Sequence, residues 1–278
     1  MKNISTRIFS HVNLEKKMSD KDWSKPLPLE TVISSSPKRI HTYDELVANV
    51  AKILYYNRNL TLYYRGQNKD YKEEGKTVIY PTIYRKKEKE NLMLKKRFES
   101  LNKKSKELKE CLKSNLNGIL GKRILNKYPE ICWSILQHYE KCPTPLLDLT
   151  QSLHVACSFA CLGNKEATGV VYVLGMPWQS DALGYNSYEE IVNIRLLNVC
   201  PPQAQRPFFQ EGYLAGPFPN YQLDNPQRRN QFDFSRRLIA KFEISNDKFF
   251  WGDGFDCIPQ KKLYPEKDLA LKFFEDIR

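Results

Sequence analysis

The sequence predicts an α+β fold in which one domain covers most of the chain. Helical patterns dominate the first half of the 278 residues and strand patterns the second, without the regular alternation of a βαβ fold. Hydrophobic residues make up 41% of the chain and aromatic residues 12%, so a sizeable core can form. No internal repeat or low-complexity linker divides the sequence, which favours one domain at 42–278 after an N-terminal arm at 1–41.

The first elements follow from capping and periodicity. Residues 1–37 are polar and end in a Ser-Ser-Ser-Pro run, which predicts an arm or an irregular entry. Thr42 and Glu45 have the spacing of a capping box, and apolar residues then recur on one helical face, so a helix is expected over 43–57. The run from Leu60 to Tyr64 has strand character and leads directly into Arg65 and Gly66.

The later elements are assigned in the same way. Helical patterns over 87–113 and 115–127 predict a basic helical region at about 86–130, inserted in the domain. Shorter helices are expected at 131–139 and 152–162, the second capped by Thr150 or Ser152. Strands are expected at 169–174, 208–214 and 238–244, and a closing helix at 266–277.

The chain is strongly basic. Its net charge is +12 and its pI about 9.2, which favours an anionic partner such as a nucleotide, a nucleic acid or an acidic protein. Residues 86–113 hold eleven Lys or Arg against five Glu. Such a run is usually the solvated face of a helix, and a nucleic-acid surface is the alternative.

Several functional classes find no support. The sequence has no GxxxxGK[ST], GxGxxG, GxSxG or HExxH motif, and no helix-turn-helix or zinc-finger signature. Seven cysteines and four histidines show no disulfide or metal-site spacing, so we expect free thiols and no metal. Without a signal-like N-terminus or a long apolar stretch, we expect a cytoplasmic protein that has no membrane partner.

Polar residues gather between Leu136 and Thr150. His138 and Asp148 lie in this stretch, and two leucines precede Asp148, so its carboxylate should sit at the edge of the core and need a donor. Arg65 at the end of a buried strand could aim a cation at a ligand, and Gly66 could let that ligand approach the backbone. The alternative for Arg65 is a buried salt bridge to Asp148. In either case we expect Arg65 to meet the 137–150 segment in space.

Short motifs follow one another along the chain in a recognisable order. They are Tyr63-Tyr64-Arg65-Gly66-Gln67, Tyr80-Pro81, Arg85, Gln137-His138-Tyr139, Pro143-Thr144, Leu146-Leu147-Asp148-Leu149-Thr150, Ala156, Phe159-Ala160, Arg206, Gln210, Gly212 and Leu263-Tyr264-Pro265-Glu266. In order and spacing this set resembles the FRG domain, a family named for its Phe/Tyr-Arg-Gly motif. The resemblance extends over about 42–278. It departs from the family at Pro145, where an Arg is usual, at Leu149, where a Trp is usual, and mildly at Ser152.

The resemblance implies a limited set of functions. FRG domains recur in bacterial and phage-linked genes, where they are suspected toxins or defence effectors, so an antitoxin or regulatory partner is conceivable. The Arg-Gly pair after a strand is also similar to the first motif of ADP-ribosyltransferases, which use NAD as a substrate. By that fold-level analogy the core would be a mixed, ADP-ribosyltransferase-like sheet. The protein would then be an NAD-consuming transferase or an NAD glycohydrolase, with a protein or nucleic acid as a possible target.

Candidate site residues follow from the two resemblances. Arginine forks suit the two phosphates of NAD, and a carboxylate or amide near the ribose stabilises its oxocarbenium character. The catalytic candidates are Arg65, His138, Thr150, Gln210 and Glu211. The candidates for binding NAD are Arg65, Gly66, Gln67, Arg85, Asp148 and Arg206.

Each of these residues also has a structural explanation. His138 could cap helix carbonyls, Asp148 could hold its loop, Thr150 could be an N-cap, and Gln210 could satisfy buried backbone groups. Two other functions stay open: a non-catalytic module that binds nucleic acid or a nucleotide, and a hydrolase or nuclease using His138 and Asp148. An enzyme should bring Arg65, His138 and Gln210 into one pocket, whereas a nucleic-acid binder should present a basic 86–113 face with exposed aromatic residues.

Overall fold

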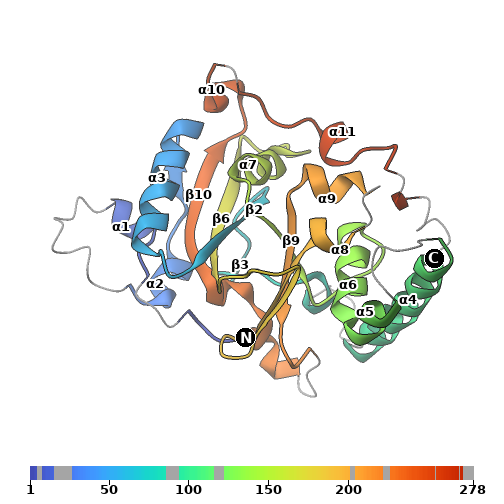
Figure 1. Ribbon diagram of the computed structural model, residues 1–278. Helices are drawn as coiled ribbons and strands as arrows, with labels where there is room; N and C mark the ends of the chain where they lie inside the picture. Colours follow the sequence, from blue (N-terminus) through green and yellow to red (C-terminus); the bar gives the residue numbers. More distant parts are fainter. Residues whose placement is uncertain are drawn as a thin grey trace.

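An eight-stranded mixed sheet forms the centre of the molecule in the computed structural model (Figure 1). The structure describes residues 1–4, 8–15, 27–85, 94–115, 122–200, 204–221, 226–253, 255–268 and 270–271. The strand order is β1-β10-β6-β2-β5-β9-β8-β7. The strands are β1 (Lys38–Ile40), β2 (Thr61–Gln67), β5 (Leu147–Thr150), β6 (Thr168–Met176), β7 (Leu183–Asn186), β8 (Ile191–Arg195), β9 (Gly212–Pro217) and β10 (Leu238–Ser245).

Antiparallel pairing dominates this sheet. Strand β1 runs parallel to β10, and the other neighbouring pairs are antiparallel. Strands β2 and β6 are paired over seven residues, from Thr61 with Met176 to Gln67 with Val170. By contrast, β2 and β5 are paired at Tyr64 with Thr150 alone. The sheet is therefore loosely joined between β2 and β5.

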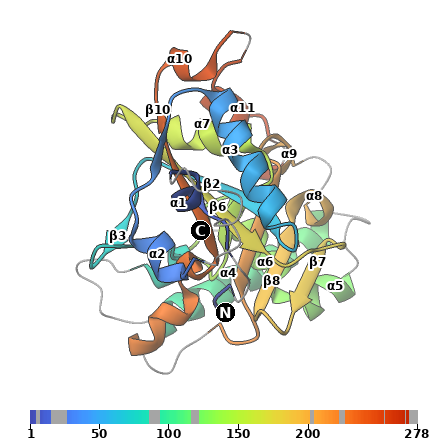
Figure 2. The ribbon, with the colours of Figure 1, turned by 90° about the vertical axis from the view of Figure 1, so that its left-hand side faces the viewer.

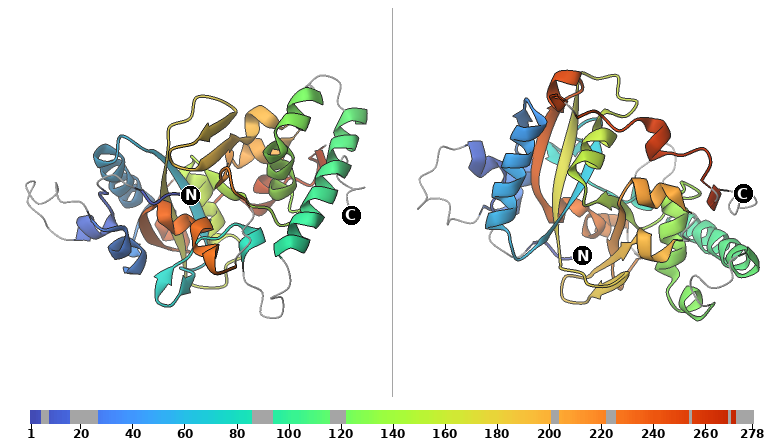
Figure 3. Two further views of the ribbon diagram at one scale, coloured as in Figure 1. Left: turned by 90° about the horizontal axis from the view of Figure 1, so that it is seen from below. Right: turned by 45° about the horizontal axis from the view of Figure 1, so that its top comes forward.

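Helices cover the sheet in separate groups. Helices α3 (Tyr43–Tyr56) and α7 (Leu153–Cys161) pack on one face through apolar residues such as Leu46, Ile53 and Ala160. Helices α4 (Leu94–Asn115), α5 (Lys122–Lys127) and α6 (Pro129–His138) gather at one end of the molecule (Figure 3). They share a second apolar cluster with β8 and β9. Short helices α8 (Leu196–Val199), α9 (Gln205–Phe209), α10 (Lys248–Trp251) and α11 (Gln260–Leu263) complete the cover.

Gly66 lets helix α7 approach strand β2. A Cβ at residue 66 would lie 1.9 Å from the backbone oxygen of Ala156 and 2.6 Å from the backbone nitrogen of Ala160. No side chain larger than hydrogen fits there unless the helix moves. The expectation that Gly66 lets a ligand approach the backbone stays a prediction, because the helix explains the need for glycine without a ligand.

Most predicted elements are present near their expected bounds. The helix at 43–57 is α3, and its capping residue is confirmed: Thr42 Oγ1 accepts from the Glu45 backbone N–H at 3.1 Å. The strands at 169–174 and 238–244 are β6 and β10, and the helices at 131–139 and 152–162 are α6 and α7. Strand β2 continues through Gln67, so Arg65 lies within the strand and not after it. Helix α4 begins the described part of the basic region at Leu94, and residues 86–93 lie outside the described residues.

Other predictions fail in identifiable places. The predicted strand at 208–214 is divided, because α9 ends at Phe209 and β9 starts at Gly212. The predicted closing helix at 266–277 is wrong only at its start, where residues 266 and 267 form a turn. Residues 270 and 271 are helical, and residues 269 and 272–278 lie outside the described residues. The segment 1–41 is not irregular throughout, since it forms α1 (His11–Glu15), α2 (Leu29–Ser34) and β1 and buries Ile8 and Phe9.

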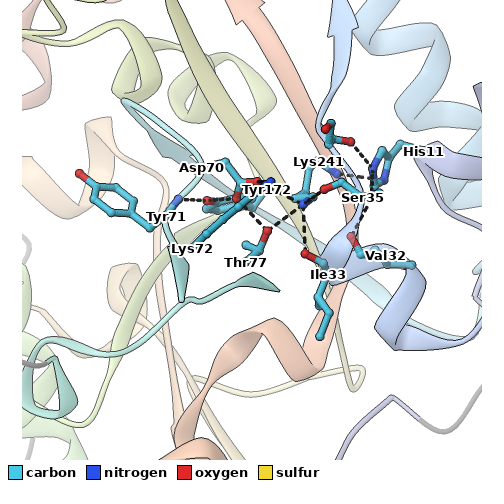
Figure 4. A network of polar contacts seen from close by, with 11 residues as sticks. His11, Val32, Ile33, Ser35, Asp70, Tyr71, Lys72, Thr77, Tyr172 and Lys241 are labelled. Carbon is cyan, nitrogen blue, oxygen red and sulfur yellow. Dashed lines mark hydrogen bonds and ion pairs between the residues drawn. The ribbon is translucent and has the colours of Figure 1, made fainter. Parts of the chain in front are cut away.

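A buried polar network ties this N-terminal segment to the sheet and to the hairpin of β3 (Lys72–Glu73) and β4 (Lys76–Thr77) (Figure 4). Lys241 on β10 is fully buried, and its ammonium donates to Ser35 O at 2.5 Å and to Thr77 Oγ1 at 2.7 Å. The same group pairs with Asp70 Oδ2 at 3.2 Å. Burial lowers the pKa of Lys241, and Asp70 opposes that shift. The Lys241 ammonium thus links β10 to the segment after α2 and to the β3–β4 hairpin region. Figure 2 shows this hairpin beside α2.

His11 belongs to this network in a defined tautomer. Its Nδ1 accepts from the Lys241 backbone N–H at 3.3 Å, so its Nε2 carries the proton and donates to Ser36 O at 3.1 Å. Burial and the nearby Lys241 lower the pKa of His11 to about 4. Protonation of Nδ1 would remove the acceptor of the Lys241 N–H, so the fold favours the neutral ring.

No helix in the described part of the chain is long and apolar enough to cross a membrane. The seven cysteines all lie in described segments, and no disulfide joins them.

Candidate active site

A cavity of about 330 Å³ opens where strands β2 and β5 are loosely joined. It brings together eight residues that the sequence singled out, although Arg65 and Arg206 are far apart in the chain: Arg65, Gly66, Arg85, His138, Asp148, Thr150, Arg206 and Gln210. The predicted meeting of Arg65 with His138, Asp148 and Thr150 is confirmed. Two predicted site residues, Gln67 and Glu211, do not line this cavity.

Arg65 bridges the gap between the two strands. Its Nη1 donates to the backbone oxygen of Asp148 at 2.7 Å. The Gln67 side-chain oxygen, in the amide orientation that satisfies both of its polar atoms, accepts from Arg65 Nε at 2.6 Å and Nη2 at 2.9 Å. Arg65 does not form the expected salt bridge with the Asp148 carboxylate. It binds the backbone carbonyl of Asp148 and lowers the pKa of the carboxyl group by its charge.

Arg65 remains a cation with binding capacity to spare. Burial lowers its pKa to about 10, Arg85 adds to that shift, and Asp148 opposes it. The guanidinium is therefore charged at neutral pH. Among the contacts of the described residues it uses three of its five N–H groups, which leaves two for an anionic ligand.

Asp148 presents a positioned carboxylate to the cavity. Gln137 Nε2 donates to its Oδ2 at 2.8 Å, and His138 Nδ1 lies 3.7 Å from its Oδ1. The side chain is still 37% exposed because it faces the cavity. Burial alone would raise its pKa, but His138, Arg65 and Gln137 together favour the charged form and hold the pKa below its usual value. The carboxylate is therefore ionised at neutral pH.

Gln137 is fixed by its own oxygen. Its Oε1 accepts from Thr82 Oγ1 at 2.9 Å and from Thr144 Oγ1 at 2.8 Å. The amide nitrogen then points at Asp148, so three side chains on three segments, Gln137, Thr82 and Thr144, orient the carboxylate.

His138 lies beside Asp148 and is almost completely buried. It is the last residue of α6 and only 2% exposed, and burial lowers its pKa more than Asp148 raises it. Its ring is neutral at pH 7, and Nε2 has no hydrogen-bond partner among the described residues. A ring this deeply placed can orient Asp148, but it exposes little surface for proton transfer to a substrate.

Thr150, Gln210 and Glu211 have mostly structural contacts. Thr150 Oγ1 accepts from the Ser152 N–H at 3.0 Å, and Ser152 itself caps α7. Gln210 Nε2 donates to Leu263 O at 2.8 Å, and the residue is 7% exposed. Glu211 is exposed, with φ at 43°, in the turn before β9. The cavity thus receives little from the three residues expected to assist catalysis.

Two further arginines make the cavity positive. Arg85 donates from Nε to Tyr80 O at 3.0 Å, and burial lowers its pKa. Arg206 pairs with Glu140 at 2.8 Å and places its guanidinium 4.2 Å from the centre of the Tyr264 ring. Against three arginines the cavity has two carboxylates, Asp148 and Glu140, so an anionic ligand is favoured.

Other lining residues were not proposed for the site. Gln137 and Tyr264 occur in the motifs, but nothing in the sequence shows that Gln137 holds Asp148 or that Tyr264 lies under Arg206. Tyr64, Leu149, Phe159 and Gly212 also occur in the motifs, whereas Thr82 and Glu140 do not. At Gly212 a Cβ would lie 3.2 Å from His138 Cε1 and 2.8 Å from Leu196, so this glycine keeps room for the histidine.

Comparison with known families agrees with the motif analysis. Residues 61–168 match the family model of the FRG domain. The chain contains an FRG domain. The match starts with the first residue of β2 and ends with the first residue of β6, so it includes Arg65, Gln137, His138 and Asp148. Arg206, Gln210 and Tyr264 lie beyond it, and the match is shorter than the expected 42–278.

No curated protein and no solved structure matches the chain. The structure itself shows the mixed α and β architecture of this chain, and an ADP-ribosyltransferase-like core stays a prediction.

Proposed function

We propose that this FRG domain binds NAD in the cavity between β2 and β5 and breaks the bond between nicotinamide and ribose. The observation that carries the proposal is that Arg65, with free N–H groups, and Asp148, with a positioned carboxylate, face one cavity. Its volume of about 330 Å³ is at the lower end of the usual range for ligand pockets, about 300–1,000 Å³.

The arginines supply the binding of the phosphates. NAD carries a diphosphate, and a planar guanidinium can hold two phosphate oxygens at once. Arg65 is held rigidly by Asp148 O and Gln67, so it loses little side-chain entropy when a ligand binds. Arg85 adds a second charge close enough to lower the pKa of Arg65.

Asp148 supplies the chemistry. When the C1′–N bond of NAD breaks, its electron pair stays with the nicotinamide, which leaves neutral, and positive charge develops on the ribose. An ionised carboxylate fixed by Gln137 and His138 stabilises that charge without reorganising. Water or a target side chain then adds to C1′ and passes its proton to bulk water. Water yields ADP-ribose, a glycohydrolase reaction, and a side chain yields an ADP-ribosylated target.

In this assignment Asp148, which was expected to bind NAD, stabilises the ribose cation in place of the catalytic candidates Gln210 and Glu211. Gln210 is engaged with Leu263 O, and Glu211 does not line the cavity. The same geometry weighs against a hydrolase or nuclease in which His138 is the base, because His138 is 2% exposed. We further propose that NAD consumption makes the protein a toxin or defence effector.

Free nicotinamide is the direct test. The purified protein is incubated with NAD, and the products are separated by chromatography. We expect nicotinamide together with ADP-ribose or a modified target. The Asp253→Asn variant, which changes an exposed carboxylate outside the cavity, should release nicotinamide at the wild-type rate. If the wild-type protein releases none, even with a cell extract as a source of targets, the proposal fails.

Nucleic-acid binding is the weaker alternative. Helix α4 exposes Lys95, Lys96, Lys103 and Lys106, but its described part has no exposed aromatic residue, since Phe98 is 2% exposed. Charge without stacking side chains predicts weak, sequence-independent binding that falls steeply with salt. Filter binding over a salt series tests this, and tight, sequence-specific binding at high salt would favour the alternative.

A further inference from the structure

A second cavity adjoins the first through two shared arginines. It has a volume of about 360 Å³, and Arg65 and Arg85 line both cavities. Gln67 and Tyr71 line the second cavity and not the first. The two cavities therefore lie side by side, with a pair of cations lining both.

The wall of the second cavity is held in place by interactions within the protein. Arg229 binds Glu73 of β3 with both terminal nitrogens, at 3.0 and 3.2 Å, and its guanidinium lies 3.7 Å from the centre of the Tyr80 ring. The other strand of the hairpin is fixed by the bond from Lys241 to Thr77, drawn in Figure 4. A ligand would meet a preformed surface and would not have to order this hairpin.

Tyr71 and Gln67 provide groups that recognise a nucleobase. Tyr71 lines the cavity and is 41% exposed, and its hydroxyl donates to Asn68 Oδ1 at 2.8 Å. An exposed aromatic ring stacks on a base of any sequence. Because the Gln67 oxygen is taken by Arg65, its amide nitrogen is the atom left to donate to a ligand.

We propose that the second cavity binds the adenosine half of a dinucleotide, whose diphosphate lies across Arg65 and Arg85. This inference rests on the proposed function, because it assigns the nicotinamide half to the cavity that contains Asp148. A dinucleotide has two nucleosides joined by two phosphates. Among the described residues, these two cavities share two arginines. The adenine stacks on Tyr71, and the reacting ribose lies beside Asp148.

Calorimetric titration of the full chain with separate parts of the substrate tests the assignment. The ligands are NAD, AMP and nicotinamide mononucleotide, and the variants are Tyr71→Ala and Tyr71→Phe. Tyr55→Ala serves as the matched control, because Tyr55 is also exposed (61%) and lines neither cavity. Tyr71→Ala should weaken NAD and AMP about ten- to a hundredfold and change nicotinamide mononucleotide less than about threefold. Tyr71→Phe keeps the ring and should bind all three nearly as the wild type does.

The outcomes separate this inference from the proposed function. Equal losses for AMP and nicotinamide mononucleotide in Tyr71→Ala, unchanged AMP binding in that variant, or no AMP binding by the wild type would each overturn the adenosine-binding cavity. If Tyr71→Ala selectively weakens AMP while the wild type releases no nicotinamide from NAD, the adenosine-binding cavity stands and the proposed cleavage fails. If Tyr71→Ala selectively weakens AMP and the wild type releases nicotinamide from NAD, both the adenosine-binding cavity and the proposed cleavage are supported.

Discussion

Two replacements of Asp148 distinguish the effect of its charge on activity from the effect of its hydrogen bond with Gln137 on stability. Asp148→Ala removes the acceptor of the 2.8 Å bond from Gln137 Nε2, while Thr82 and Thr144 keep the Gln137 oxygen in place. Gln137 is 8% exposed, so its amide is left without a partner at a cost of about 1–3 kcal/mol. For a chain of this size that corresponds to a drop in Tm of about 2–12 °C.

Asp148→Asn keeps an oxygen for Gln137 and removes the charge. We expect its Tm to stay within about 2 °C of the wild type, because no buried donor loses its partner. If the carboxylate stabilises the ribose cation, nicotinamide release should fall about a hundred- to a thousandfold, as when one electrostatic group is removed from an active site.

Thermal melting by circular dichroism and the initial rate of nicotinamide release are the two readouts, and Asp253→Asn is the control for both. A wild-type rate in Asp148→Asn would refute the catalytic role of the carboxylate. An unchanged Tm in Asp148→Ala would show that the bond from Gln137 contributes nothing to stability.

Three further predictions follow from other contacts. Arg65→Lys keeps a cation but not the fork that binds Asp148 O and Gln67, so nicotinamide release should fall at least about tenfold, and a near wild-type rate would contradict the bidentate role. Gly66→Ala places a Cβ 1.9 Å from Ala156 O and should destabilise the fold by about 1–3 kcal/mol or more. Gly184→Ala should be tolerated, because its Cβ would lie 3.3 Å from its nearest neighbour, a Gln179 side-chain atom. Equal Tm values of the two variants in a thermal melt would refute this prediction. His11 has a pKa of about 4 in the fold against 6.5 unfolded, so the unfolded state binds more protons between these values, and stability should fall by at most about 3 kcal/mol as pH drops from 6.5 to 4. Urea unfolding at several pH values measures that loss, which His11→Gln should reduce.

The convergence at the site could be predicted because its residues conflict with their local sequence. Arg65 follows a run of strand-forming residues, and Asp148 follows two leucines, so each polar group had to find a partner across the chain. The partner atom could not be predicted: Arg65 binds the carbonyl of Asp148 and not its carboxylate. Likewise, local patterns placed His138 at a helix end but could not show how deeply the ring is buried.

Elements that depend on distant pairing were missed or misplaced. Strands β5 and β7 have four residues each, and β1 has three and pairs with β10 some 200 residues later in the chain. Such strands carry little periodicity, and their neighbours in the sheet decide their conformation. The second cavity could not be read from the sequence for the same reason, since the wall formed by Tyr71 depends on a hairpin fixed by Lys241 and Arg229.

The central claim is that NAD lies across Arg65 with its nicotinamide ribose beside Asp148. A crystal structure of Asp148→Asn soaked with NAD tests it most directly, because this variant should bind the dinucleotide without cleaving it. We expect the diphosphate within hydrogen-bond distance of Arg65, the nicotinamide ribose beside residue 148 and the adenine against Tyr71. NAD bound elsewhere on the protein, or an empty cavity in crystals of a variant that still releases nicotinamide in solution, would contradict it.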